Sequence, residues 1–318
     1  MSIAVYLQHI GRSAAGAQGL TKAAAHALMA DVLDGHASAA ETGAFVMALR
    51  MRAPTLDELV GLLQAAQERC IGVTSPQPVV LVPSYGGACR LPNLTPLLAM
   101  SLAREGLNVL VHGPTTAPSC VCSAAILADL GLAAAQQPQD IEHAWSRREP
   151  AFVPTALLCP ALQPLLDLRA LIGLRGPGHT VAQLLNPVRG APALRLVNHS
   201  HAEAAALMGA WAQREGADAQ LLRGTEGEPV ADPQRLPRID TWLAGVLRPE
   251  LSVPAQEGPL TELPLLPRAQ DVAGTAVYVQ EVLSGSRPAP TPLARQVALV
   301  KAAVAELLAR QTARECSV

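Results

Sequence analysis

Glycine and polar residues suited to anion binding gather between residues 83 and 131. The stretch opens with the sequence PSYGG, which carries Gly86 and Gly87. Loops of this kind hold a diphosphate with successive backbone N–H groups, and the close approach of the backbone requires glycine. Pro83 removes one N–H group, and the phenol of Tyr85 fills space that a phosphate needs. The loop therefore has the frame of a phosphate site but has lost part of its chemistry.

This stretch resembles, without a gap, the pattern of the anthranilate phosphoribosyltransferases, which belong to glycosyltransferase family 3. The shared framework positions are Gly86, Asn93, Leu94, Thr95, His112, Gly113, Ser119, Ala124, Leu127, Leu130 and Gly131. The cationic positions differ, because Val111 replaces a basic residue and Pro114-Thr115 replaces Asn-Arg. The resemblance implies a remnant substrate site, whose members we take to be Ser84, Tyr85, Gly86, Asn93, Thr95, His112, Ser119 and Glu228.

Two further parts of the family pattern are altered. Enzymes of this family bind magnesium with an adjacent Asp-Glu pair, and the matching place here holds Glu226 and Glu228, which are not adjacent. We interpret these acids as solvated loop residues. In the stretch that recognises anthranilate, Arg175 keeps its spacing but Gly178-His179 replaces Phe-Asn. We therefore expect no catalytic residue, no metal and no cofactor.

Other motifs resemble a second branch of the same fold, the YbiB-type nucleic-acid-binding proteins. The motifs are VPSY at 82–85, NLTPLLA at 93–99, VHG at 111–113, Arg175 with His179-Thr180, and GTEGE at 224–228. This resemblance covers almost the whole chain. It implies a homodimer, joined through N-terminal helices, that binds DNA or RNA with little sequence preference through a basic groove.

The charge pattern fits such a groove only locally. The net charge is −2, which gives no global attraction for a polyanion. However, residues 168–202 and 69–104 contain no carboxylate. From these spans and the motif segments we select the candidate nucleic-acid-binding residues Arg90, Arg104, Arg175, His179, Arg195, His201 and Arg223. With only 3% aromatic residues, contact with the phosphate backbone is favoured over base stacking.

Length and composition indicate a globular protein with a large core. The chain has 318 residues, of which 50% are hydrophobic, and no apolar run approaches the ~18–20 residues of a membrane span. The six cysteines form no CxxC pair, so a zinc site is not indicated and we expect free thiols in a reducing compartment. Cys89 and Cys120 lie in the motif segments and could face the substrate cleft, but no neighbouring residue in the sequence is expected to activate them. We expect a cytoplasmic protein without membrane contact.

The pattern of elements predicts two domains of the nucleoside phosphorylase and phosphoribosyltransferase type. Residues 1–75 form a small helical domain, where Ser38 with Glu41 and Thr55 with Glu58 have the spacing of capping boxes. Residues 76–318 form a larger α/β domain with a central, mostly parallel sheet, and the chain crosses back to the helical lobe near 160–187. The composition of residues 224–270 predicts loops and short strands. The sequence from Asp271 onward predicts two helices.

Three functions remain open from the sequence. The first is sequence-independent nucleic-acid binding by a homodimer. The second is a divergent phosphoribosyl- or nucleoside-transferring enzyme, hence a pentosyltransferase, that uses Ser84, Asn93, Thr95, Ser119 and Glu228. The third is a metabolite sensor whose remodelled cleft binds another anion, which ligand stabilisation in a thermal-shift screen would reveal.

Overall fold

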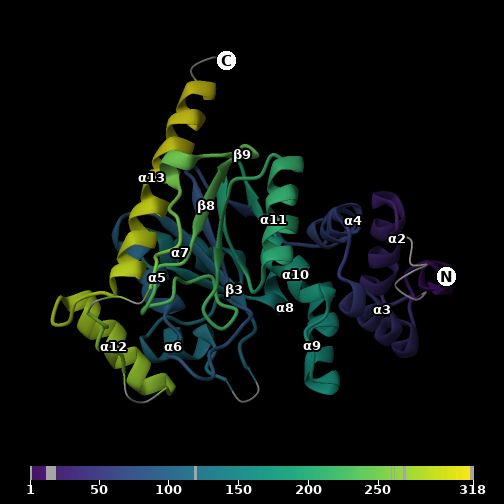
Figure 1. Cartoon of the computed structure of the whole chain (residues 1–318), viewed down its shortest axis with the longest axis horizontal. Coiled ribbons are helices and arrows are strands. Elements are labelled where there is room, and N and C mark those ends of the chain that lie inside the picture. Colours follow the sequence, from purple (N-terminus) through teal and green to yellow (C-terminus); the bar gives the residue numbers. More distant parts are fainter. Residues whose placement is uncertain are drawn as a thin grey trace. The chain divides into compact units, whose positions relative to one another are not determined.

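The computed structural model describes residues 2–11, 19–117, 120–258, 260, 262–267 and 270–315. The chain divides into two compact units, whose segments can be followed by colour in Figure 1. The first unit comprises Met1–Ile71 with Thr155–Pro187, and the second comprises Gly72–Pro154 with Val188–Val318. The chain thus leaves the helical unit, builds part of the sheet unit, and returns once before completing the sheet.

The first unit is helical, and its three longest helices each start at a residue whose side chain caps the helix. Its elements are α1 (Ala4–Ile10), α2 (Lys22–Leu33), α3 (Ala39–Arg52), α4 (Leu56–Gln67), α8 (Thr155–Leu158), η1 (Pro160–Leu162), α9 (Gln163–Ile172) and α10 (Pro177–Leu184). Both predicted capping boxes are present, Ser38 with Glu41 before α3 and Thr55 with Glu58 before α4. Each box satisfies two N–H groups that the first helical turn leaves without partners.

Helices α2 and α4 pack closely because one glycine removes the side chain at their contact. A Cβ atom on Gly61 would overlap the backbone carbonyl of Lys22. Beside this contact Glu58 is buried, where it accepts a hydrogen bond from the Leu20 N–H at 2.8 Å and pairs with Arg52. The carboxylate of Glu58 therefore joins two helix starts and the end of α3.

The second unit is built on a seven-stranded sheet with the order β4-β3-β2-β6-β7-β8-β9. The strands are β2 (Val79–Pro83), β3 (Asn108–Gly113), β4 (Ala151–Pro154), β6 (Ala193–His199), β7 (Ala219–Arg223), β8 (Ile239–Leu243) and β9 (Val246–Leu247). The first five strands in this order are parallel, and β8 and β9 add antiparallel pairs. A separate parallel pair joins β1 (Val73–Thr74) to β5 (Val188–Arg189).

The core lies where helices cover the central strands. Strands β2 and β3 are buried along their whole length, as expected of parallel strands covered on both faces. Val80 and Val82 of β2 belong to one apolar cluster with Leu98 of α5 (Thr95–Arg104), Val279 of α12 (Val272–Ser284) and Val300 of α13 (Thr291–Glu315). The remaining helices are α6 (Ser123–Asp129), α7 (Pro138–Ser146), α11 (Ala202–Arg214) and η2 (Pro249–Leu251). Of these, α11 packs along β6 and β7.

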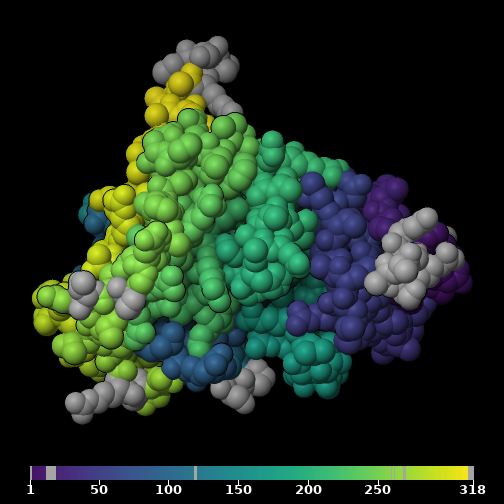
Figure 2. Space-filling model, viewed as in Figure 1, coloured from purple at the N-terminus to yellow at the C-terminus, as the bar shows by residue number. Residues whose placement is uncertain are grey.

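This is the predicted fold class, a small helical domain with a larger α/β domain around a mostly parallel sheet. The observed division falls at Ile71 and Gly72, with the return at Thr155–Pro187, where the sequence suggested 75–76 and 160–187. The irregular segment after β7 contains β8, β9 and η2, and its green atoms cover much of the visible face of the second unit in Figure 2. The final helices are α12 and α13, as predicted.

Candidate functional site

The loop after β2 lies at the carboxyl edge of the parallel strands. In open α/β sheets ligands bind at this edge. They bind at the point where the loops after two adjacent strands lead to opposite sides of the sheet. Here the backbone N–H groups of Gly86 and Gly87 donate hydrogen bonds of 2.6 and 2.8 Å to Glu228 Oε1. A Cβ on Gly86 would lie 2.8 Å from that oxygen, so the contact requires glycine. Thr95 donates to the second oxygen, Oε2, at 3.0 Å.

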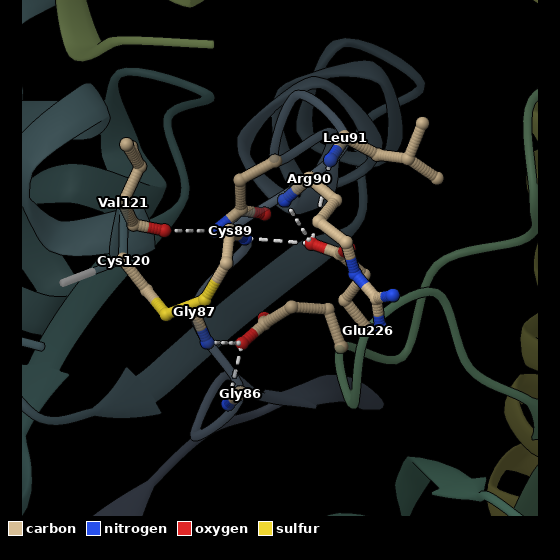
Figure 3. Close-up of a disulfide and its surroundings, with 10 residues drawn as sticks. Gly86, Gly87, Cys89, Arg90, Leu91, Cys120, Val121 and Glu226 are labelled. Carbon is tan, nitrogen blue, oxygen red and sulfur yellow. Dashed lines mark hydrogen bonds and ion pairs between the residues drawn. A yellow bond between two sulfur atoms is a disulfide. The ribbon is translucent and has the colours of Figure 1, made fainter.

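A second carboxylate, that of Glu226, binds the next part of the same loop. Its Oε2 accepts hydrogen bonds from the N–H groups of Cys89 at 2.6 Å, Arg90 at 3.0 Å and Leu91 at 3.4 Å (Figure 3). The Arg90 guanidinium lies 3.4 Å from the other oxygen. Five backbone N–H groups of the loop are thus bonded to two side chains of the chain itself.

A tight turn presents both carboxylates to the loop. Thr225 and Glu228 pair through two backbone hydrogen bonds, and the central residues Glu226 and Gly227 have φ of 52° and 85°. Two left-handed residues are the signature of a two-residue hairpin turn. Glu226 is one of the few non-glycine residues in this conformation, which costs about 1–3 kcal/mol. Asn198, at the end of β6, donates to the Gly227 carbonyl at 3.1 Å and fixes the turn.

The two carboxylates have different electrostatic environments. Burial raises the pKa of Glu228, and hydrogen bonds from Gly87, Thr95 and Gly86 oppose that effect without cancelling it. Partial burial also acts on Glu226, but there the backbone donors and the Arg90 charge lower the pKa below its usual value. Glu228 is only 1% exposed, so the interpretation of this residue as a solvated loop acid is wrong.

Tyr85 lies inside the protein beside His112. The phenol oxygen is 3.0 Å from His112 Nδ1, and the rings meet edge to face with centroids 5.5 Å apart. Both residues are buried, at 2% and 0% exposure. Burial lowers the pKa of His112 to about 3, so the ring is neutral at physiological pH. His112 therefore supplies no positive charge to an anion at this edge.

The remaining predicted site residues form a buried polar cluster. The Ser84 hydroxyl donates to Ser123 Oγ at 2.7 Å, and the Asn93 amide donates to the same oxygen at 3.1 Å. Asn93 Oδ1 also accepts from the Thr95 N–H at 3.1 Å, at the start of α5. Sequence reasoning missed Ser123, although it directly follows the two cysteines of the motif segment. Ser119 lies outside the described residues.

A disulfide joins Cys89 to Cys120, with Cα atoms 4.6 Å apart (Figure 3). The expectation of free thiols is wrong for this pair. The two loops that follow β2 and β3 bring the cysteines together, because Ala88 and Val121 exchange two backbone hydrogen bonds beside them. Cys70, Cys122 and Cys159 are not in disulfides, and Cys316 lies outside the described residues.

Three candidate nucleic-acid-binding residues lie at the carboxyl edge of the sheet. Arg90 follows β2 and its side chain is 91% exposed, and Arg223 ends β7 and is exposed. His201 follows β6, where its Nδ1 accepts from the Ala204 N–H at 3.3 Å and caps α11.

The other four candidates occupy different places. Arg104 ends α5, the helix that returns from the carboxyl edge, and binds the Leu283 carbonyl. Arg195 lies over the Trp211 ring at 4.7 Å, and burial lowers its pKa to about 10. Arg175 and His179 belong to the helical unit. Burial lowers the pKa of His179 to about 3, so that side chain is neutral.

The donor set does not suit a magnesium diphosphate. Glu228 Oε1 and Glu226 Oε2 accept hydrogen bonds from the backbone of the loop itself. Within the part of the chain that the structure describes, no group of three or more His, Cys, Asp or Glu side chains is arranged to hold a metal ion. In that same part, no helix is both long enough and apolar enough to cross a membrane.

Solved structures with the same fold are anthranilate phosphoribosyltransferases. The enzyme from Thermus thermophilus superposes with a TM-score of 0.67 at 21% identity, over 92% of this chain and 87% of that one. The enzyme from Saccharomyces cerevisiae in complex with PRPP and Mg gives 0.69 at 14% identity, over 96% and 89%. At these identities the likeness establishes the fold alone.

Sequence relatives define the family. Residues 6–70 match the helical bundle domain of the glycosyl transferase family. The chain is 33% identical to the uncharacterized protein YbiB of Escherichia coli K12, over 94% of this chain and 93% of YbiB. It is 30% identical to the anthranilate phosphoribosyltransferase of Nitratidesulfovibrio vulgaris, over 81% and 78%. The chain therefore belongs to the glycosyltransferase family 3 group that contains YbiB and the anthranilate phosphoribosyltransferases.

Proposed function

We propose that this protein is a homodimer that binds DNA or RNA without sequence preference and has lost the transferase activity of its enzymatic relatives. The observation that carries the proposal is the occupation of the loop after β2. The N–H groups of Gly86 and Gly87 bind Glu228, and those of Cys89, Arg90 and Leu91 bind Glu226. The protein's own carboxylates take the place that an anionic substrate would need.

A sugar diphosphate meets two obstacles in this loop. It would compete for the same N–H groups, and it would lie against the negative charge of Glu226, whose pKa is lowered. Displacing Glu228 would leave a buried carboxyl group without its donors, which costs several kcal/mol. Tyr85, beside this loop, has its ring packed inside the protein against His112. These features support loss of diphosphate binding rather than a change of acceptor.

Long polyanions need no entry into this loop. Arg90 and Arg223 are exposed at the same sheet edge, and the Glu226 charge beside Arg90 is already engaged by three N–H groups. Arginines at such positions bind phosphates from the protein surface, and the release of counterions makes the affinity depend on salt. Arg175 of the helical unit remains a further candidate.

Fluorescence anisotropy with a labelled oligonucleotide tests the proposal. Substituting Arg90→Gln or Arg223→Gln should weaken binding to all sequences equally and reduce the salt slope by about 1 for each arginine. Arg147→Gln is the matched control, because Arg147 is exposed but follows α7, which leads into the amino end of β4. Absence of binding at low salt, or binding that salt does not change, would contradict the proposal.

A divergent pentosyltransferase is the second candidate, and the buried polar cluster favours it. Ser84, Asn93 and Thr95 keep the hydroxyl and amide groups of the family pattern, and Glu228 accepts from Thr95. Its direct test is release of diphosphate from phosphoribosyl diphosphate in the presence of magnesium and a set of aromatic amines and nucleobases. Turnover that disappears in Asn93→Ala would support the enzyme and contradict the loss of activity.

A further inference from the structure

The disulfide between Cys89 and Cys120 fastens the loop that carries Arg90. Cys89 lies between Ala88, which pairs with Val121, and Arg90, whose N–H group binds Glu226. The cross-link therefore ties the loop after β2 to the loop after β3 at the point where the first loop reaches the surface. Gly87 packs beside the cross-link, since a Cβ there would lie 3.1 Å from Cys120 Cβ.

The position of the disulfide makes it accessible to a thiol reagent. Cys89 is exposed and Cys120 is partly exposed, whereas the free thiols of Cys122 and Cys159 are buried. Exposed disulfides exchange readily with external thiolates, because exchange requires attack in line with a sulfur atom. In cytosolic proteins of mesophiles, disulfides of this kind are usually transient, catalytic or redox-sensing.

We propose that Cys89–Cys120 is a reversible redox latch that holds the Gly86–Leu91 loop, and with it Arg90, in the arrangement that receives a nucleic-acid phosphate. A dithiol reductant opens it. One reductant thiolate attacks Cys89 Sγ, the S–S bond breaks, and Cys120 leaves as a thiolate that takes up a proton. The second reductant thiolate then attacks the mixed disulfide and releases Cys89, so that two protein thiols and one reductant disulfide result.

Opening the latch loosens the loop without dismantling it. The Ala88–Val121 hydrogen bonds and the bonds from Cys89, Arg90 and Leu91 to Glu226 do not depend on the cross-link. After reduction these hydrogen bonds break more easily, because the cross-link no longer limits how far the two loops can move apart once the bonds are broken. A preorganised loop loses less freedom on binding, so the oxidised protein should bind nucleic acid more tightly than the reduced protein. Only this last step rests on the proposed function.

The first experiment measures the latch without nucleic acid. Protein purified without reductant is denatured and its thiols are counted before and after treatment with dithiothreitol, which should reveal two additional thiols. Hydrogen exchange of the native protein is then compared with and without dithiothreitol. The amides of Cys89, Arg90 and Leu91 should exchange roughly tenfold faster after reduction, whereas those in the middle of α5 should not change.

Variants assign the effect to this pair of cysteines. The double variant Cys89→Ser/Cys120→Ser should exchange like the reduced protein and should not respond to dithiothreitol. Cys122→Ser is the matched control, because Cys122 follows β3 as Cys120 does but is not in the disulfide. Its thiol donates a hydrogen bond to the Thr115 carbonyl at 3.2 Å. This variant should keep the full response. An equal thiol count before and after reduction, or exchange that reduction leaves unchanged, would overturn the latch.

The second experiment measures anisotropy of a labelled oligonucleotide at both redox states. Reduction should weaken binding by roughly three- to tenfold, and the double variant should match the reduced protein. Equal affinity in the two states, together with faster exchange, would overturn the link between latch and binding. If neither state binds, the proposed function and this link both fail, while the exchange result still decides whether the latch exists.

Discussion

At the residue scale, Glu228 shows how one side chain can close a binding loop. Its carboxyl group accepts from Gly86, Gly87 and Thr95 and is almost fully buried. A buried carboxylate of this kind is stable only because its donors are fixed in place. The same donors would be available to a phosphate only if Glu228 left. The residue that stabilises the loop is therefore also the one that blocks diphosphate binding.

Substituting Glu228→Ala should destabilise the protein by roughly 3 kcal/mol, because two buried N–H groups and a hydroxyl lose their acceptor. Glu228→Gln should cost less, since its amide oxygen can still accept from Gly86 and Gly87. Urea unfolding followed by circular dichroism measures both. A loss below about 1 kcal/mol in the alanine variant would show that water replaces the carboxylate without penalty.

The pH dependence of stability should reveal Glu228 as well. Because its folded pKa is raised, its contribution is fully present below the unfolded pKa of about 4.3 and is lost as the pH rises through the folded value. The free energy of unfolding of the wild type, measured relative to Glu228→Gln, should therefore fall between pH 4 and neutral pH. A relative stability that increases over this range would contradict the raised pKa.

The contribution of His112 to the free energy of unfolding should depend on pH in the opposite direction. Burial lowers its folded pKa to about 3, so its contribution is present above the unfolded pKa of about 6.5 and is lost as the pH falls. Between pH 6 and pH 4 the free energy of unfolding should decrease by up to about 1.4 kcal/mol per pH unit from this group. His112→Gln should remove that part of the slope in urea titrations, and an unchanged slope would indicate a protonated ring.

At the element scale, signals from residues close together in the sequence predict helices and strands. The sequence NVLVHG predicts a strand, and β3 covers Asn108–Gly113. Ser38 and Thr55 predict helix starts because a capping box involves residues only three positions apart. The contacts of Glu226 and Glu228 were not predictable in this way, since they join residues 133 to 142 positions apart.

Two glycines in neighbouring helices should respond oppositely to alanine. Gly61→Ala places a Cβ against the Lys22 carbonyl and should destabilise the protein by about 1–3 kcal/mol. Gly43 of α3 has no atom within 4 Å of an added Cβ, so Gly43→Ala should stabilise it by about 0.5–1 kcal/mol through helix propensity. Thermal unfolding of both variants measures the contrast, and equal shifts would show that α2 and α4 do not pack as described.

At the scale of the whole molecule, the charge pattern of the sequence does not map simply onto the surface. The span without carboxylates between Asp167 and Glu203 is divided between the two units, because the chain passes from one to the other after Pro187. Arg195 within this span stacks on Trp211, and His179 is neutral. Burial and chain topology determine where these side chains lie, and neither can be predicted from the spacing of charged residues in the sequence. Homodimer formation stays a prediction.

Calorimetric titration with phosphoribosyl diphosphate and magnesium tests the central claim most directly. We predict no saturable binding to the wild type up to millimolar ligand, because Glu226 and Glu228 occupy the N–H groups of the loop after β2. Saturable binding in the micromolar to low millimolar range, retained in Arg90→Gln and lost in Thr95→Ala, would contradict it.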